Sequence, residues 1–170
     1  PYEDIQSNVL GSVQLMQEMV AQGVRRIVFA SSGGTVYGVP VEVPIREDHP
    51  TQPQVSYGIC KLMIEKYLGL FTQLHGLRPV SLRIANPYGG RQRIDTAQGA
   101  VAVFLHRALH REPVEIWGDG SVVRDYLHVA DVANAISAAH GYDGRHQVMH
   151  VGAGRGLSLN GLLDEIEALL

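Results

Sequence analysis

A phenol and an ammonium lie four residues apart in this sequence, at Tyr57 and Lys61. On a helix, this spacing places the two side chains on one face, about one turn apart. A nearby ammonium favours the phenolate, so we expect Tyr57 to titrate below the roughly 10 of a free phenol and to shuttle a proton near neutral pH. The alternative interpretation is an ordinary pair on a solvated helix, because this spacing is common.

Hydroxyls and glycines form a second group upstream, in the segment SSGGTVYG that ends at Gly38. They follow a short apolar run, 26–30, which predicts a buried strand. In open α/β sheets, ligands bind at the carboxyl edge of the strands. Ser32 and Thr35 are therefore candidates to contact a ligand, and the alternative is that both only cap the strand end.

Helix-like and strand-like segments alternate along the chain and determine where these groups lie. The periodicity predicts helices at 5–20, 56–74, 98–109, 131–139 and 159–169, the last capped by Ser158. Short apolar runs predict strands at 26–30, 79–85, 113–117, 126–129 and 148–151. Four prolines predict a loop over 39–54, and 86–90 is expected to be a turn. The alternation predicts a parallel sheet with helices on both faces, the doubly wound α/β class.

The composition points to a small-molecule protein. The chain has 170 residues, a net charge of -3 and no broad basic segment, so neither nucleic acid nor an anionic membrane is the expected partner. A single cysteine, Cys60, excludes an internal disulfide and suggests a reducing, cytoplasmic compartment. No metal site is expected, and His106 and His110, four apart, are interpreted as a solvated helix face. The chain starts without Met, so we expect a longer parent.

Taken together, several motifs resemble the extended short-chain dehydrogenase/reductase family of NAD-dependent epimerases and dehydratases, closest to its UDP-glucose 4-epimerase group. The motifs are SSGGTVYG, the proline-rich loop with EDHP, SYGICKLMIEKYL, LRIANPYG and GDGSVVRDYLHVADVANAI. The resemblance covers almost the whole chain. It implies that residues 1–89 form the second half of an NAD-binding Rossmann domain. Residues 90–170 would then form part of a sugar-nucleotide region interleaved with the last Rossmann elements, and the glycine-rich phosphate loop would lie upstream.

The resemblance assigns catalytic roles. It implies that Tyr57 is the general acid/base, and that Lys61 binds the nicotinamide ribose of NAD and lowers the pKa of the tyrosine. The family places a Ser or Thr four residues before the tyrosine of VYG, a position that is Gly33 here. Ser32 or Thr35 would then polarise the sugar oxygen, and Ser32, which would also contact NAD, is favoured.

Binding roles are implied for four further residues. Asn8 would lie under the cofactor, Ala85 would contact the nicotinamide through its backbone, Asn86 would bind the sugar nucleotide together with Thr35, and Arg124 would pair with its diphosphate. Other interpretations remain open. Asn8 suits an exposed helix face, Asn86 an ordinary turn, and Arg124 a structural pair with the next residue, an aspartate.

Two conspicuous features are interpreted as structural. The glycine-rich turn at 151–156 lacks the final G-x-x-G spacing and a later acidic residue, so it is not expected to bind a dinucleotide phosphate. Trp117 aligns loosely with a position near the nucleobase, but a lone Trp on a strand is more often part of a core.

The absence of a carboxylate at Gly33 and Gly34 favours simple epimerisation over dehydration. In that reaction Tyr57 takes the proton of the sugar 4-hydroxyl while NAD takes hydride, and hydride returns to the other face of a 4-keto intermediate. A UDP-sugar is the expected substrate, and the helices that begin at Asp4 and Ser56 resemble the family's four-helix homodimer interface. The alternatives are an inactive or incomplete fragment, or an NAD(P)-dependent dehydratase or reductase.

Overall fold

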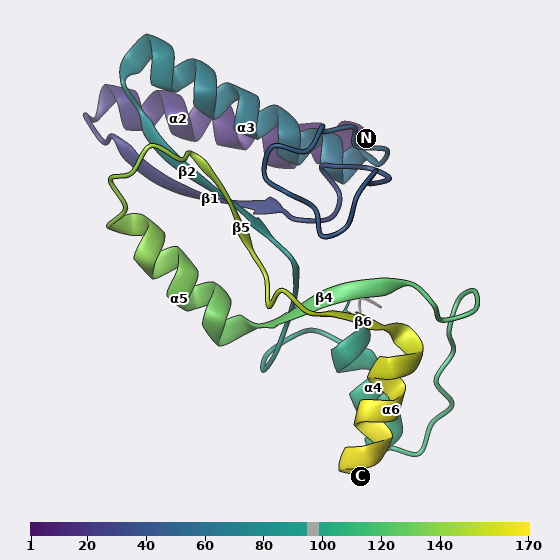
Figure 1. Ribbon diagram of the computed structural model, residues 1–170. Helices are drawn as coiled ribbons and strands as arrows, with labels where there is room; N and C mark the ends of the chain where they lie inside the picture. The colour runs from purple at the N-terminus through teal and green to yellow at the C-terminus, as the bar shows by residue number, and fades with distance from the viewer. Residues whose placement is uncertain (95–98) are drawn as a thin grey trace. The chain divides into compact units, whose positions relative to one another are not determined.

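The computed structural model describes residues 1–94 and 99–170. The chain divides into two compact units (Figure 1). Unit 1 comprises Pro1–Ile84 and Asn134–Val151, and unit 2 comprises Ala85–Ala133 and Gly152–Leu170. The chain therefore enters unit 2, returns to unit 1 and leaves it again.

Unit 1 contains a parallel sheet of three strands in the order β1 (Arg26–Ser32), β2 (Arg78–Ile84) and β5 (Val148–Val151). Ser32 pairs with Ile84, and Ile84 pairs with Val151, so the three strands end level with one another. The strands predicted at 26–30, 79–85 and 148–151 are confirmed. Their carboxyl ends form the edge at which open α/β sheets bind ligands.

Helices cover both faces of this sheet. Successive strand residues point to opposite faces. Phe29 packs into a core with α2 (Gly11–Ala21) and α3 (Ser56–His75). Its neighbour Val28 packs on the other face, against Leu82 of β2 and against Ala139 of α5 (Val129–His140). The predicted doubly wound α/β class is therefore confirmed. The helices predicted at 56–74 and 131–139 occur as α3 and α5, with ends shifted by at most two residues.

The helix that carries Tyr57 and Lys61 has clear boundaries. Val55, at its N-cap, is extended, and the proline-rich segment before it forms no helix or strand, as predicted. Gly76 ends the helix in the left-handed conformation at φ 67°, which glycine adopts without steric cost.

The first predicted helix is interrupted. It consists of α1 (Tyr2–Asp4), a π-helical segment η1 (Ile5–Leu10) and α2. The hydroxyls of Ser7 and Ser12 donate to the carbonyls of Glu3 and Asn8, four residues back, at 2.6 Å each. Such bonds compete with the backbone ladder and loosen a helix. The prediction of one regular helix over 5–20 is therefore wrong over η1.

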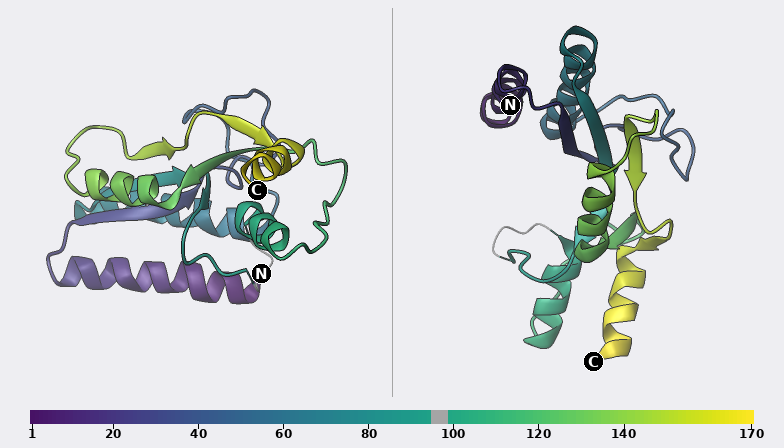
Figure 2. Two further views of the ribbon diagram at one scale, coloured as in Figure 1. Left: turned by 90° about the horizontal axis from the view of Figure 1, so that it is seen from below. Right: turned by 90° about the vertical axis from the view of Figure 1, so that its left-hand side faces the viewer.

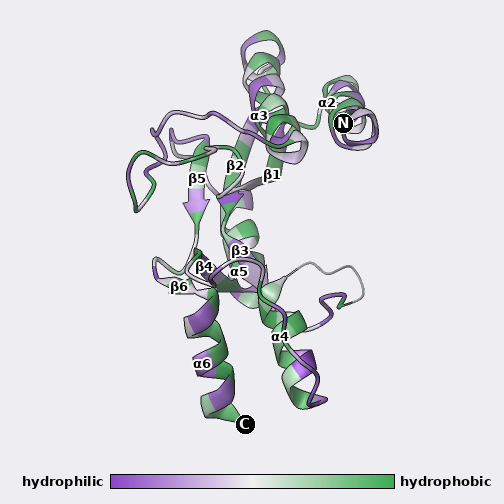
Figure 3. Cartoon of the chain, turned by 90° about the vertical axis from the view of Figure 1, so that its right-hand side faces the viewer, coloured by the Kyte–Doolittle hydropathy of each residue, from purple (hydrophilic) through white to green (hydrophobic). Residues whose placement is uncertain are grey.

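Unit 2 is built on a mixed sheet in the order β3 (Asn86–Tyr88), β4 (Val123–His128) and β6 (Gly156–Ser158). The helices α4 (Ala100–Leu109) and α6 (Leu159–Leu169) pack side by side around Phe104, Leu162 and Ile166 (Figure 2). Hydrophilic and hydrophobic residues alternate along α6 (Figure 3), as expected of a helix with one buried face. Ser158 caps α6 as predicted, because its Oγ accepts from Gly161 N at 3.0 Å.

Three local predictions in unit 2 need correction, and a fourth falls outside the described residues. The segment 113–117 is an irregular loop instead of a strand, since Val114 and Ile116 pack against the helices without joining a sheet. Trp117 is 85% exposed and is not part of a core. The turn expected at 86–90 begins as strand β3, which pairs with β4. Gln98, the predicted start of a helix, lies outside the described residues.

Over residues 1–94 and 99–170, no helix is both long and apolar enough to cross a membrane.

Candidate active site

Tyr57 and Lys61 lie on one face of the first two turns of α3. The Lys61 Nζ is 5.4 Å from the centre of the Tyr57 ring and 4.9 Å from that of Phe29. It donates a hydrogen bond to the Ala30 carbonyl at 2.9 Å. The ammonium is therefore held at the carboxyl end of β1, and the spacing predicted from the sequence does make the two side chains neighbours.

The protonation states differ from the expectation. Burial raises the pKa of the Tyr57 phenol above its usual value and lowers the pKa of the Lys61 ammonium. Among the described residues, the hydrogen bond found for the Lys61 ammonium goes to the Ala30 carbonyl. The predicted lowering of the tyrosine pKa is therefore wrong for the chain by itself, and the Tyr57 phenol is neutral at pH 7.

Ser32 and Thr35 form a hydroxyl pair at the end of β1. The Thr35 Oγ1 donates to Ser32 Oγ at 2.8 Å, and the Thr35 amide contacts the same oxygen at 3.3 Å. Since Ser32 Oγ accepts both bonds, its own hydrogen is left to donate to a ligand. Gly33, where the family hydroxyl was expected, donates its amide to Ile84 O at 2.7 Å, and a Cβ there would lie 3.0 Å from that oxygen. A side chain at Gly33 would be tightly crowded by the backbone of β2, which favours Ser32.

Gly58 brings these two groups together. A Cβ at this position would lie 2.4 Å from the Thr35 carbonyl oxygen, closer than real Cβ atoms approach backbone. Only glycine therefore allows the first turn of α3 to pack against the Ser32–Thr35 turn. Tyr57 is the residue before Gly58 in this turn of α3. Ser32, Thr35, Tyr57 and Lys61 all belong to unit 1.

A buried charge network supports this edge, and the sequence analysis missed it. The Arg83 guanidinium binds both carboxylate oxygens of Glu65, at 2.7 and 3.1 Å, and each side chain is 6% exposed. Ser31 Oγ donates to the same carboxylate at 2.5 Å. Arg83 also donates to the Tyr37 hydroxyl at 2.6 Å, and that hydroxyl contacts the ring of His150. The network joins β1, β2, β5 and α3.

Apart from the ion pair of Arg83 and Glu65, the network includes two titratable side chains, Tyr37 and His150, that are uncharged at neutral pH. Burial raises the pKa of the Tyr37 phenol and lowers the pKa of the His150 ring, so both are neutral. The amide of His150 donates to the Glu47 carboxylate at 3.1 Å and lowers the pKa of Glu47. The sequence does contain one sign of this network, because Arg83 is a charged residue within the apolar strand LRIA. The sequence does not identify Glu65 as its partner.

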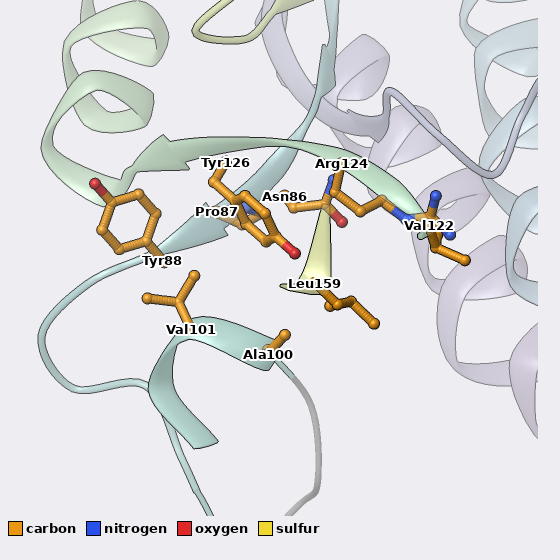
Figure 4. A pocket seen from close by; sticks show the side chains of 10 residues that line it. Asn86, Pro87, Tyr88, Ala100, Val101, Val122, Arg124, Tyr126 and Leu159 are labelled. Atoms are coloured by element: carbon orange, nitrogen blue, oxygen red, sulfur yellow. The ribbon is translucent and has the colours of Figure 1, made fainter. Parts of the chain in front are cut away.

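Unit 2 holds two of the three predicted sugar-nucleotide residues, Asn86 and Arg124, around a pocket of about 240 Å³ (Figure 4). Asn86 lies beside Tyr126 in the parallel register and donates to the Asp125 carbonyl at 3.2 Å. Arg124 and Tyr126 are two residues apart on β4 and both line this pocket. The Arg124 guanidinium is exposed, and the hydrogen bond found for it among the described residues goes to the carbonyl of the preceding residue, Val123, at 2.9 Å.

Asp125 rules out two alternatives. Its carboxylate accepts from the amides of Ala153 and Gly154 at 2.8 and 2.9 Å. It therefore stabilises the glycine-rich turn instead of pairing with Arg124, and the structural pair considered for Arg124 is wrong. The same bonds occupy the amides that a phosphate would need, in agreement with the prediction that this turn is not a dinucleotide loop.

Two predicted cofactor residues lie elsewhere in the chain. Asn8 is half-buried in η1, where its Nδ2 donates to Asp4 O at 3.1 Å and approaches Ser7 Oγ at 3.2 Å. Single-turn π segments are frequent at functional sites. Ala85 is the first residue of unit 2 after β2 and is half-buried. The binding roles of Asn8 and Ala85 stay predictions.

The sequence profile of the NAD dependent epimerase/dehydratase family matches residues 1–152. The chain belongs to this family. Among its relatives, it is 40% identical to UDP-glucose 4-epimerase of Mycolicibacterium smegmatis over 91% of this chain and 49% of that protein. It is also 36% identical to dTDP-4-dehydro-6-deoxyglucose reductase of Escherichia coli over 97% of this chain and 52% of that protein. The chain thus spans about half the length of the curated relatives it matches.

Solved structures give the same relationship. UDP-glucose 4-epimerase of Thermotoga maritima, determined with UDP-glucose, aligns with a TM-score of 0.96 and 39% identity over 99% of this chain and 55% of that one. The enzyme of Thermus thermophilus, determined with NAD, aligns with a TM-score of 0.87 and 36% identity over 96% of this chain and 54% of that one. The fold is therefore that of NAD-dependent sugar-nucleotide epimerases over about half their length.

Proposed function

We propose that this chain carries the catalytic half of an NAD-dependent nucleotide-sugar 4-epimerase that acts on a UDP-sugar. The observation that carries this proposal is the close packing of the first turn of α3, which bears Tyr57, against the Ser32–Thr35 turn, with glycines at the two positions between those hydroxyls. Neutral donors and one acid/base phenol suffice for epimerisation, whereas dehydration needs a further acid/base group. The UDP-glucose 4-epimerases among the relatives support the same reaction.

The donor set at this edge also suits the nicotinamide end of NAD. Lys61 and Tyr57 offer an ammonium and a hydroxyl to a ribose, and Asn8 and Ala85 are proposed to contact the cofactor as well. NAD, when bound, supplies reversible hydride transfer at the sugar carbon. Since burial raises the pKa of Tyr57, formation of the phenolate requires further positive charge near Lys61, which an oxidised nicotinamide carries.

Each residue then has a separate role. Ser32, whose hydrogen is free, donates to the reacting sugar oxygen, and Thr35 fixes the orientation of Ser32. Tyr57 takes the proton of the 4-hydroxyl and returns it after the ring has turned. Lys61, anchored on Ala30, orients the tyrosine and the ribose. Asn86 and Arg124 of unit 2 are proposed to hold the sugar nucleotide, the arginine at its diphosphate.

Replacement of Tyr57 tests the proposal. In the full-length protein, Tyr57→Phe should lower kcat for UDP-galactose formation from UDP-glucose by about 100- to 10,000-fold, because general acid/base catalysis contributes that much. Product formation is followed by NMR, and circular dichroism verifies the fold. Tyr67→Phe, on the same helix, is the matched control and should retain activity. Full activity of Tyr57→Phe would remove the phenol from the mechanism.

A second candidate function is reduction of a 4-keto sugar nucleotide, because the relative from Escherichia coli is named as such a reductase. The same phenol would then protonate the new hydroxyl. Oxidation of NADH or NADPH in proportion to a dTDP- or UDP-4-keto-6-deoxy sugar favours the reductase. Epimerisation of UDP-glucose without net change in cofactor absorbance favours the epimerase. An inactive fragment remains the third case, indicated by failure of the purified protein to retain NAD.

We also propose a cytoplasmic homodimer. The helices α2 and α3 pack against each other through a shared core, yet α3 exposes Ile59, Leu70 and Leu74, and α2 exposes Leu15. Positions 59 and 70 are three helical turns apart, so they lie on one stripe. A second copy of the two helices would bury this stripe as a four-helix interface. Light scattering of Leu70→Lys, which should yield monomers, tests the interface.

A further inference from the structure

Three polar side chains form one row across the parallel sheet of unit 1. Ser31, Arg83 and His150 are partners in the parallel register, so they lie at the same level of β1, β2 and β5, one residue before the ends of these strands. Side chains alternate between the two faces of a strand. Phe29, two residues before Ser31, packs into the core shared with α3, so the row lies on the face that α3 covers.

Glu65 of α3 binds two members of this row at once. Its Oε1 accepts from Ser31 Oγ at 2.5 Å and from Arg83 Nε at 3.1 Å, and its Oε2 accepts from Arg83 Nη2 at 2.7 Å. A buried ion pair contributes little net stability compared with an apolar pair, because the loss of water from two charges offsets their attraction. Stability alone therefore does not account for two buried charges at this place.

The position of Glu65 on α3 gives these contacts a second consequence. Tyr57, Lys61 and Glu65 follow one another at intervals of four residues, so they lie along one side of the helix. Lys61 is bonded to the Ala30 carbonyl and Glu65 to the next residue, Ser31. Apolar packing is non-directional, whereas a hydrogen bond depends on distance and angle. Two successive turns of α3 are thus attached by directional bonds to two successive residues of β1.

We propose that Glu65 is a positioning residue of the epimerase. By binding Ser31 and Arg83 together, it fixes the position of α3 along β1, and with it the position of Tyr57 and Lys61 relative to the end of that strand. The inference rests on the proposed function and adds a residue to which the motif comparison assigned no role. Glu65 acts through the helix and not on the substrate, so its loss should lower kcat and leave KM unchanged.

The first test removes one hydrogen bond and keeps the ion pair. In the full-length protein, Ser31→Ala should lower kcat for UDP-glucose epimerisation about tenfold at a temperature well below Tm, as expected for a lost bond to a charged group. A merely structural bond would change Tm and leave kcat of the folded enzyme unchanged. Ser81→Ala is the matched control, because Ser81 is a 3% exposed serine of β2 whose side chain forms no hydrogen bond with α3 among the described residues. Its kcat should not change.

A second variant separates position from stability. Ser31→Ala, Glu65→Leu and Arg83→Met together replace the whole contact by apolar side chains, so no buried charge or hydroxyl of the contact is left unpaired. Tm should stay the same or rise, whereas kcat should fall at least as far as in Ser31→Ala. If this triple variant does not fold, the comparison of Ser31→Ala with Ser81→Ala decides the point.

A titration without turnover gives an independent measurement. In the NAD complex, the ultraviolet absorbance of the Tyr57 phenolate, identified by its absence in Tyr57→Phe, should appear at higher pH in Ser31→Ala, because a displaced Lys61 favours the phenolate less. Ser81→Ala should titrate like the unaltered protein. An unchanged kcat and titration in Ser31→Ala, or equal changes in both serine variants, would overturn the role of Glu65. If the unaltered protein binds NAD but does not convert UDP-glucose, the epimerase proposal fails while the titration still tests Glu65.

Discussion

The two units of the molecule differ in how completely their buried polar side chains are paired. In unit 1, Arg83 and Glu65 satisfy each other behind the catalytic edge, with Ser31 and Tyr37 attached to them. In unit 2, the Tyr126 hydroxyl has no partner among the described residues. The difference shows that a satisfied charge network backs the sheet edge of unit 1, whereas unit 2 has buried polar atoms that the described residues leave unpaired.

The strongest test of this contrast removes the cation of the paired network. Arg83→Met leaves the Glu65 carboxylate buried without its partner, which should lower the free energy of unfolding by about 3–5 kcal/mol. The measurement is urea unfolding of the full-length protein. Arg155→Met provides the matched control, because the Arg155–Glu165 pair in unit 2 is exposed and should contribute little. Equal losses for the two variants would contradict the contrast.

The catalytic edge was more predictable than the network behind it. The neighbouring positions of Tyr57 and Lys61, and the alternation of strands, turns and helices, could be predicted from the spacing of residues along the chain. Such spacing is informative because each prediction concerns a single helix or strand. The pairing of Arg83 with Glu65 joins a strand to a helix 18 residues earlier in the chain. No periodicity encodes such a contact.

The pKa of Tyr57 shows a second limit of sequence inference. The spacing placed Lys61 within reach, but it did not reveal that the ammonium donates a hydrogen bond to the Ala30 carbonyl or that burial sets the direction of the Tyr57 pKa shift. The loop at 113–117 shows a third limit of inference from the sequence. Its apolar residues suggested a strand, whereas they pack against helices, and hydrophobicity alone does not distinguish these two kinds of burial.

A smaller effect is expected from disturbing the approach of α3 to the hydroxyl pair. In Gly58→Ala, the new methyl group would lie against the Thr35 carbonyl, so the first turn of α3 must move and carry Tyr57 with it. We expect kcat to fall about 100-fold, as for a displacement near 1 Å at a catalytic group.

Gly69→Ala is the control on the same helix. A Cβ at Gly69 meets no atom within 4 Å, and alanine favours helix over glycine, so this variant should keep full activity and gain about 0.5–1 kcal/mol of stability. Steady-state kinetics of both variants decide the point. Unchanged kcat in Gly58→Ala would mean that the close approach at Gly58 does not position Tyr57.

The smallest expected effect is a pH dependence of stability from His150. Burial lowers the pKa of this ring in the folded state, so below about 6.5 the unfolded chain binds a proton that the folded protein resists. Stability should therefore fall as pH decreases through that value toward the lower folded pKa. Glu47, whose pKa is also lowered, acts only below its own ordinary range near 4.5. Urea midpoints between pH 5.5 and 8 should slope upward for the unaltered protein and be flatter for His150→Asn. An identical slope in both proteins would show that the ring takes up its proton as readily in the folded network as in the unfolded chain.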